Sequence, residues 1–364
     1  MKKFTNNLLF KPVALALSVL LLGSCDKNDD DKTPEAEYRT GVFVTNEGSF
    51  QTPTGTISFL KASTGSMHNN IFKQVNNRPM GDVAQSMAFY QDKAYLVANN
   101  SNKIEIVNAL TFKSVGVIEN LVYPRYFVAF GNKGYVTEWL DYDVAGQVSV
   151  IDLSTNTIIK KIAVDPNPEQ MLVHEGKVYV TCSSTNTLKV IDSATDAVTA
   201  TITVQDAPNS LVMDAAQNIW VLCGGKVLYN ADWSLDTVNS TAGSLVKFNS
   251  AAPGAQTVIP FSTNKLHPSR LTTNGTKTKL YYTLNQLNYQ GRIYEMAVSA
   301  TGIPDAPLIN QQVYGLGVDP ATNTIYGGKP GSFTDNGWMV RYTAAGAPVD
   351  SFKVGIGPNG FYFR

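Results

Sequence analysis

Cysteine is scarce in this chain of 364 residues, which has only Cys25, Cys182 and Cys223. Their spacing matches no zinc-ligand pattern, and so few cysteines cannot build a disulfide-based fold. Cys182 and Cys223 end two similar short apolar segments. We therefore expect them to be buried free thiols, bridged only if their Cα atoms approach within about 7 Å.

The chain also lacks an excess of either basic or acidic residues. The chain has 29 basic and 29 acidic residues, so its formal net charge at pH 7 is zero. Proteins that bind nucleic acid carry a basic patch or stripe, and we expect no nucleic-acid partner here. Beyond residue 25 no long stretch shows a sustained helical period of apolar residues, which indicates an all-β chain.

The apolar run near the N-terminus, Val13–Leu22, is too short to cross a bilayer, because a membrane-spanning helix needs roughly 20 residues. Lys2 and Lys3 precede the run, a pattern typical of an export signal. Leu22-Gly23-Ser24-Cys25 ends it and resembles a bacterial lipobox. We predict a lipoprotein signal peptide over residues 1–24 and lipidation of Cys25. The alternative is an ordinary signal peptide followed by a chance cysteine.

A short acidic segment follows this cysteine. Residues 26–32 read DKNDDDK, which resembles the surface-export signal of bacteroidete-type lipoproteins. The same run would serve as a solvated tether, because it has no apolar residues to bury. We predict a flexible acidic tether over residues 25–38 and a folded domain over residues 39–364. The protein would then be held at the outer membrane by its lipid anchor, facing the cell exterior.

Internal repetition is what the sequence has in abundance. A strand-like segment with a central aromatic residue, such as Val178-Tyr179-Val180-Thr181, recurs at intervals of roughly 40–60 residues, close to the period of propeller repeats. The seven aromatic residues are Phe43, Tyr95, Tyr135, Tyr179, Trp220, Tyr281 and Tyr326.

A second strand follows each aromatic segment, as in Thr187–Asp192, and a polar turn and another apolar strand come next. Four strands in a unit of this length make one propeller blade. We therefore predict an all-β, seven-bladed β-propeller. Gly360–Phe363 would join the blade of Phe43 and close the ring, which hides the inner strand edges. Six or eight blades stay open, because the long fifth unit has room for an extra hairpin.

The two faces of such a propeller differ in their loops. Turns between first and second strands, such as Glu175-Gly176-Lys177, are short and polar. Loops between second and third strands are longer and carry large aromatic residues, which are costly to expose without a functional reason. The alternative is that these residues pack on one another. They are Phe50, Trp139, Tyr142, Trp233, Tyr289 and Phe333.

Polar residues at the entry into each blade form a second group on that face. Five of the seven entries follow a proline, which fixes the turn. The candidate residues at the entries are Gln85, Arg125, Tyr126, Gln170, Asn209, Arg270, Tyr314 and Asn359. Together they would form a funnel suited to a large, neutral, amphipathic ligand that carries many amides or hydroxyls. The alternative is that they solvate a water-filled axis.

Signs of catalysis are few. His68, His174 and His267 lie in different parts of different repeats, and no nucleophile elbow or phosphate-binding loop occurs. Propeller lactonases hold a metal with inward carboxylates and amides, and Glu169 with Asn209 would imitate only part of that set. We expect a binding protein with no catalytic residues, no metal and no cofactor, and keep a metal-dependent lactonase as the less favoured alternative.

The repeat signature in Lys177–Thr181 and Leu188–Asp192 resembles the YncE-like propeller family. Val44–Phe50 at the start of the domain, with Val313–Pro320 and Val354–Pro358 near its end, resembles the surface-lipoprotein branch of that family in bacteroidetes. The resemblance covers essentially the whole chain after the signal peptide.

That branch includes the cobalamin-capturing lipoprotein BtuG. The resemblance implies that this chain also captures cobalamin or related corrinoids on its funnel face and passes them to a TonB-dependent outer-membrane transporter. Corrin amides would match the amide, hydroxyl and guanidinium groups of the funnel, and aromatic side chains would cover the apolar parts of the ring. Relatives with the same fold could instead bind glycans or proteins on this face.

Overall fold

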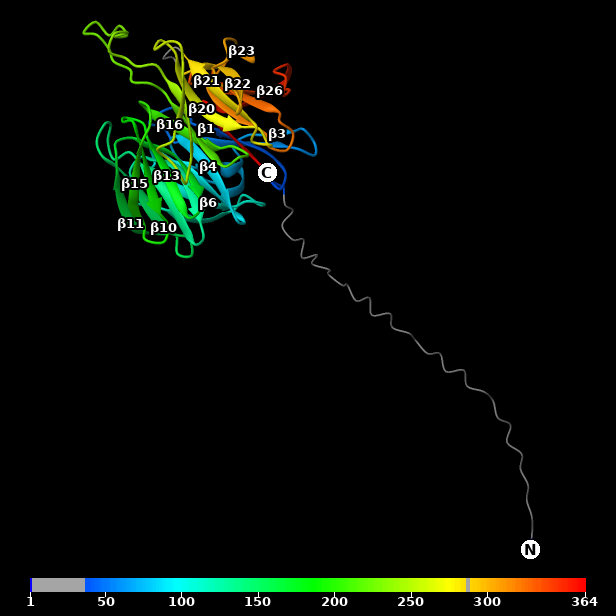
Figure 1. Cartoon of the computed structure of the whole chain (residues 1–364). Coiled ribbons are helices and arrows are strands. Elements are labelled where there is room, and N and C mark those ends of the chain that lie inside the picture. The colour runs from blue at the N-terminus through cyan, green and yellow to red at the C-terminus, as the bar shows by residue number, and fades with distance from the viewer. Residues whose placement is uncertain (2–36, 286–288) are drawn as a thin grey trace. The chain divides into compact units, whose positions relative to one another are not determined.

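The structure is a computed structural model that describes Met1, residues 37–285 and residues 289–364. The described residues form seven antiparallel sheets of four strands each. The sheets follow one another in chain order, as the colours of Figure 1 show. The innermost strands β4, β8, β12, β16, β20, β24 and β28 each contact the next, and β28 contacts β4. The ring is therefore closed, and the prediction of an all-β, seven-bladed β-propeller is confirmed.

The seven blades share one plan. Four strands lie side by side from the axis outward, and each runs antiparallel to its neighbour. From inside to outside the strands are β28 (Pro358–Phe363), β1 (Gly41–Asn46), β2 (Thr56–Lys61) and β3 (Met67–His68); β4 (Ala84–Tyr90), β5 (Lys93–Ala98), β6 (Lys103–Asn108) and β7 (Ser114–Ile118); β8 (Pro124–Phe130), β9 (Lys133–Glu138), β10 (Gly146–Asp152) and β11 (Thr157–Val164); β12 (Pro168–His174), β13 (Lys177–Cys182), β14 (Thr187–Asp192) and β15 (Ala197–Thr203); β16 (Pro208–Met213), β17 (Asn218–Cys223), β18 (Ser244–Asn249) and β19 (Thr257–Pro260); β20 (His267–Thr273), β21 (Lys279–Asn285), β22 (Gly291–Ala297) and β23 (Ile309–Val313); and β24 (Gly315–Val318), β25 (Ile325–Lys329), β26 (Asn336–Tyr342) and β27 (Pro348–Ile356).

The two ends of the domain are joined in one blade, as predicted. Strand β28 pairs antiparallel with β1, so that Phe43 lies opposite Tyr362 and Val44 opposite Phe361. This pairing covers an edge of β1 that would otherwise expose unpaired backbone groups.

The seven aromatic residues that mark the sequence repeats, from Phe43 to Tyr326, all lie in the second strands of their blades and are buried. Each of seven apolar clusters combines residues from two neighbouring blades; in one of them Tyr95 of β5 stacks on Phe127 of β8 with ring centroids 4.2 Å apart. A single blade would leave this apolar surface in water, so the blades stabilise one another by burying it.

Two features of the structure, a short helix and the packing of Tyr38, are not indicated by any pattern in the sequence. A six-residue helix, α1 (Ile71–Asn76), links the first blade to the second and buries Ile71 and Phe72. It is too short to show a helical period. Tyr38, the last residue of the predicted tether, packs against Phe59 and Phe112.

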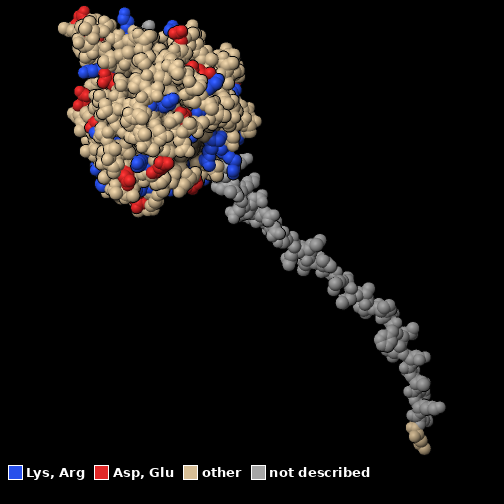
Figure 2. All heavy atoms as spheres, in the orientation of Figure 1, with Lys and Arg blue, Asp and Glu red and all other residues tan. Residues whose placement is uncertain are grey.

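Cys182 and Cys223 are buried and free, as expected, and burial raises the pKa of both thiols to about 12. No helix in the described part of the chain is long and apolar enough to span a membrane. Residues 2–24 of the predicted signal peptide, Cys25 and the tether up to residue 36 lie outside the described residues. On the face shown in Figure 2, acidic and basic side chains are interspersed among uncharged ones.

Candidate functional site

A cavity of about 730 Å³ opens on the face where the chain enters each blade. Its wall combines the starts of the innermost strands with loops between second and third strands. Six innermost strands carry a β-bulge close to their start, which takes the entry residues out of regular pairing and re-aims their side chains. The predicted residues that line the cavity are Phe50, Gln85, Arg125, Tyr126, Trp139, Gln170, Asn209, Arg270, Tyr314 and Phe333.

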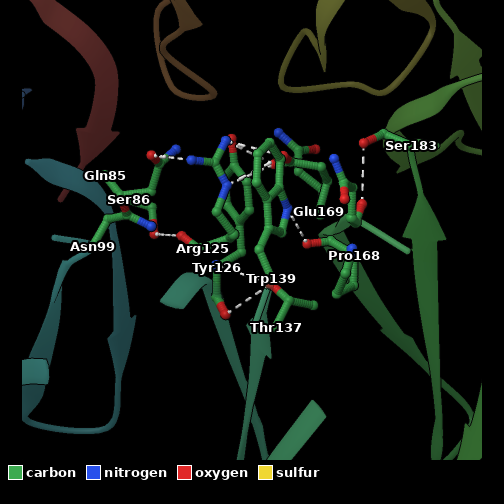
Figure 3. Close-up of polar contacts among 12 residues, drawn as sticks. Gln85, Ser86, Asn99, Arg125, Tyr126, Thr137, Trp139, Pro168, Glu169 and Ser183 are labelled. Atoms are coloured by element: carbon green, nitrogen blue, oxygen red, sulfur yellow. Dashed lines mark hydrogen bonds and ion pairs between the residues drawn. The ribbon is translucent and has the colours of Figure 1, made fainter. Parts of the chain in front are cut away.

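Arg125 is the centre of the best-connected part of the wall (Figure 3). Its guanidinium lies 3.0 Å from Glu169, and its Nη1 donates to Oε1 of Gln85 at 2.7 Å. The guanidinium carbon lies 4.4 Å from the ring centroid of Trp139, a cation–π distance. The indole N–H in turn donates to the carbonyl of Pro168 at 3.1 Å. Arg125 is thus held by three residues from three blades, Gln85, Trp139 and Glu169.

The buried ion pair has its charge balanced within the wall. Burial raises the pKa of Glu169, and the attraction of Arg125 opposes that rise. The same pairing raises the pKa of Arg125, although burial alone would lower it. The pair therefore presents a dipole to the cavity and no net charge.

Arg270 and Tyr314 form the opposite part of the wall. The Arg270 guanidinium carbon lies 5.1 Å from the ring centroid of Tyr314, and Phe333 meets the same ring edge-on at 5.1 Å. The Tyr314 hydroxyl donates to the Glu47 carboxylate at 2.8 and 2.9 Å. Burial, followed by the charge of Glu47, raises the pKa of Tyr314 well above its usual range.

A second space of about 210 Å³, lined by the innermost strands, adjoins the cavity and forms a channel. Gln85, Tyr126, Gln170 and Arg270 line both spaces and define the neck between them. Asn359 lies below the neck and is buried. It donates to Glu47 and to two backbone carbonyls, and it accepts from Thr45, so its side chain holds β28 to the neighbouring strands.

Three predicted aromatic residues lie away from the cavity and are exposed. Tyr142 borders a separate groove of about 630 Å³ between loops of neighbouring blades. Trp233 is 83% exposed in the long loop after β17, beside Tyr229 at 6.4 Å between ring centroids. Tyr289 is 76% exposed before β22.

Sequence reasoning did not select several residues that line the cavity. Glu47, Asn99 and Ser183 share one register position with Trp139, since each directly follows the second strand of its blade. Aligning the repeats on the ends of those strands would have identified all three.

The histidines lie outside the cavity wall. His174 ends β12, at a turn on the face opposite the cavity. His267 is buried, with Nδ1 at 3.0 Å from the carbonyl of Gly224. Within residues 37–285 and 289–364, no three His, Cys, Asp or Glu side chains form a group that could hold a metal ion.

Solved structures share this fold at low identity. A quinonprotein alcohol dehydrogenase-like protein from Bacteroides thetaiotaomicron is 16% identical, with a TM-score of 0.65 over 90% of this chain and 78% of that one. The periplasmic gluconolactonase PpgL of Pseudomonas aeruginosa is 13% identical, with a TM-score of 0.59 over 88% of this chain and 99% of that one. At these identities the likeness shows the propeller fold alone.

No curated protein matches the sequence of this chain. One family model does, the "Domain of unknown function (DUF5074)", and its match covers residues 40–363, essentially the whole propeller. The chain, a seven-bladed β-propeller, therefore belongs to the DUF5074 family.

Proposed function

We propose that this protein is a non-catalytic capture protein that binds a large amphipathic small molecule, a corrinoid such as cobalamin, in the funnel cavity. The observation that carries the proposal is the convergence of ten predicted side chains on one cavity of about 730 Å³. Ligand sites are commonly of this size and combine apolar walls with a few placed polar groups.

The chemistry of the wall suits such a ligand. Trp139, Tyr314 and Phe333 supply apolar surface, and Gln85, Gln170 and Asn209 supply amides. The charged groups are Arg125, Arg270, Glu47 and Glu169, two of each sign, so the wall favours a ligand that is neutral overall. The corrinoid class itself comes from the family resemblance of the sequence.

The resemblance also supplies the proposed setting. The protein would be lipid-anchored through Cys25 at the outer membrane, face the cell exterior, and pass its ligand to a TonB-dependent transporter. A glycan or a protein bound at the same face is the alternative, and a lactonase is less favoured because Glu169 is already paired with Arg125 at 3.0 Å.

Two tryptophans on the same face give a matched test. Trp139 lines the cavity, whereas Trp233 is 83% exposed outside it. In isothermal titration with cyanocobalamin, we expect Trp139→Ala to weaken binding about tenfold or more, because losing a buried aromatic contact costs on the order of 2 kcal/mol. Trp233→Ala should bind like the wild type.

The titration has two outcomes that contradict the proposal. No heat with wild-type protein at micromolar concentration would remove the corrinoid as ligand. Equal binding by both tryptophan variants would place the ligand outside the funnel.

A further inference from the structure

The two arginines of the funnel differ in their partners: a carboxylate pairs with the charge of one and not with that of the other. Arg125 has a carboxylate at 3.0 Å. For Arg270, by contrast, no carboxylate of the described residues lies within 4.0 Å, and its one hydrogen bond runs from Nη1 to the backbone carbonyl of Asn359 at 3.0 Å. A guanidinium has five N–H donors, so about four of those of Arg270 remain unused at the cavity wall.

The neck around Arg270 is rich in other unused donors. Gln85 uses its side-chain oxygen to accept from Arg125, which leaves its amide N–H groups without a partner in the described part of the chain. The Gln170 amide and the Tyr126 hydroxyl, which line the same neck, likewise have no side-chain partner among those residues. Donors therefore outnumber acceptors at this level of the funnel.

The charges of two carboxylates, Glu47 and Glu169, act on Arg270 without a direct ion pair, and Glu169 is already paired with Arg125. The oxygens of Glu47 accept hydrogen bonds from the Tyr314 hydroxyl and from the Asn359 amide at 2.8–2.9 Å. Glu47 is thus satisfied by neutral donors and makes no direct ion pair with Arg270. Tyr314 contacts both residues, since Arg270 lies over its ring and Glu47 accepts from its hydroxyl.

The backbone at Arg270 also has an unusual conformation. Its φ is 64°, in the left-handed region that a long side chain seldom adopts, and it lies within the β-bulge between Ser269 and Thr272. Strain of this kind persists only where the surrounding structure holds it, and it concentrates at ligand sites. The Arg270 side chain lines both the cavity and the channel.

From these observations we infer that Arg270 forms an oxyanion subsite at the neck of the funnel, which receives a phosphate or carboxylate group of the bound ligand with help from Gln85, Gln170 and Tyr126. Arg pairs with such groups through parallel N–H donors. The inference rests on the proposed ligand-binding role of the funnel and narrows the ligand to one that carries an oxyanion, balanced by positive charge elsewhere if the molecule is neutral overall.

The test uses small probes, so that it does not depend on the identity of the natural ligand. The purified protein is titrated calorimetrically with phenyl phosphate, benzoate and the uncharged benzyl alcohol. We expect at least one of the anions to bind and benzyl alcohol to bind at least tenfold more weakly. The comparison of phenyl phosphate with benzoate identifies which oxyanion the subsite prefers.

Three variants give the expected pattern. Arg270→Met should weaken anion binding at least tenfold, and Arg270→Lys, which keeps the charge but loses the planar fork, should give an intermediate affinity. Arg292→Met is the matched control, because Arg292 is exposed on β22 outside the cavity, and it should bind like the wild type. A thermal unfolding curve for each variant verifies that it is folded.

Two results would overturn the subsite: no binding of either anion to the wild type, or anion binding that a folded Arg270→Met or Arg270→Lys variant leaves unchanged. Cyanocobalamin is titrated in parallel. If it fails to bind while phenyl phosphate binds through Arg270, the corrinoid proposal falls and the oxyanion subsite stands.

Discussion

Arg125 and Arg270 carry the same charge into the same cavity, yet their surroundings give them different roles. Glu169, Gln85 and Trp139 hold Arg125 in place, so it shapes the wall. Arg270 has one hydrogen bond to a carbonyl and keeps its remaining donors for a ligand. Residue type alone could not separate the two, because the difference lies in whether the entry strand of a neighbouring blade brings a carboxylate within reach, as β12 brings Glu169 to Arg125.

The buried Tyr38 and the partly buried Tyr362 give a prediction for alkaline pH. Burial raises the pKa of Tyr38 and of Tyr362 to about 12, from an ordinary value of 10.0, whereas these groups ionise near pH 10 in the unfolded chain. Folding therefore favours the protonated phenols. The stability they contribute is complete below pH 10 and is lost as the pH rises toward 12.

Absorbance of tyrosinate at 295 nm checks this, with the same titration in strong denaturant as control. At pH 11 the native protein should hold clearly less tyrosinate than the denatured chain, and its urea midpoint should lie below that at pH 9. Ionisation of all 17 tyrosines near pH 10, with the native circular dichroism retained, would show that these phenols are not buried.

At the scale of elements, the closing strand β28 is the part on which the ring depends most directly. It pairs with β1 and contacts β24 and β4, so it links the last blade to the first two. Phe361 of β28 is buried in the cluster that joins the first and last blades, with its ring centroid 5.7 Å from that of Tyr326.

We expect Phe361→Ala to lower the free energy of unfolding by about 3–5 kcal/mol, because it leaves a cavity in this cluster. Val115→Ala is the control, since Val115 is half exposed on the outer strand β7, and should change stability by about 0.5 kcal/mol or less. Urea unfolding measures both. Equal stabilities for the two variants would contradict the role of β28 in closing the ring.

The sequence predicted the strands well because each blade repeats the same aromatic and alternating pattern, and burial acts on that pattern in the same way seven times. Loop residues were harder to place. Trp139 follows its strand directly and lines the cavity, whereas Trp233 lies in a loop that pairs with itself, through hydrogen bonds between Asn230 and Ser234 and a bridge between Tyr229 and Leu235. The direction of such a loop depends on local bonds that composition does not reveal.

At the scale of the whole molecule, closure of the ring is what creates the site. Residues from Glu47 to Phe333, separated by almost the whole domain in sequence, meet in one cavity because seven blades bring their entry turns to the same end of the axis. The turns on the other face are short and polar, such as Gly131-Asn132 and Glu175-Gly176. We therefore expect the ligand to bind on one face of the propeller only.

Hydrogen exchange measured by mass spectrometry, with and without saturating cyanocobalamin, tests this claim most directly. We expect slower exchange in separate peptides that contain the starts of β4, β8, β12, β16 and β20 and the loop after β1, with no change at turns such as Gly131-Asn132 and Glu175-Gly176. Protection confined to the turns of the opposite face, or no protection anywhere, would contradict it.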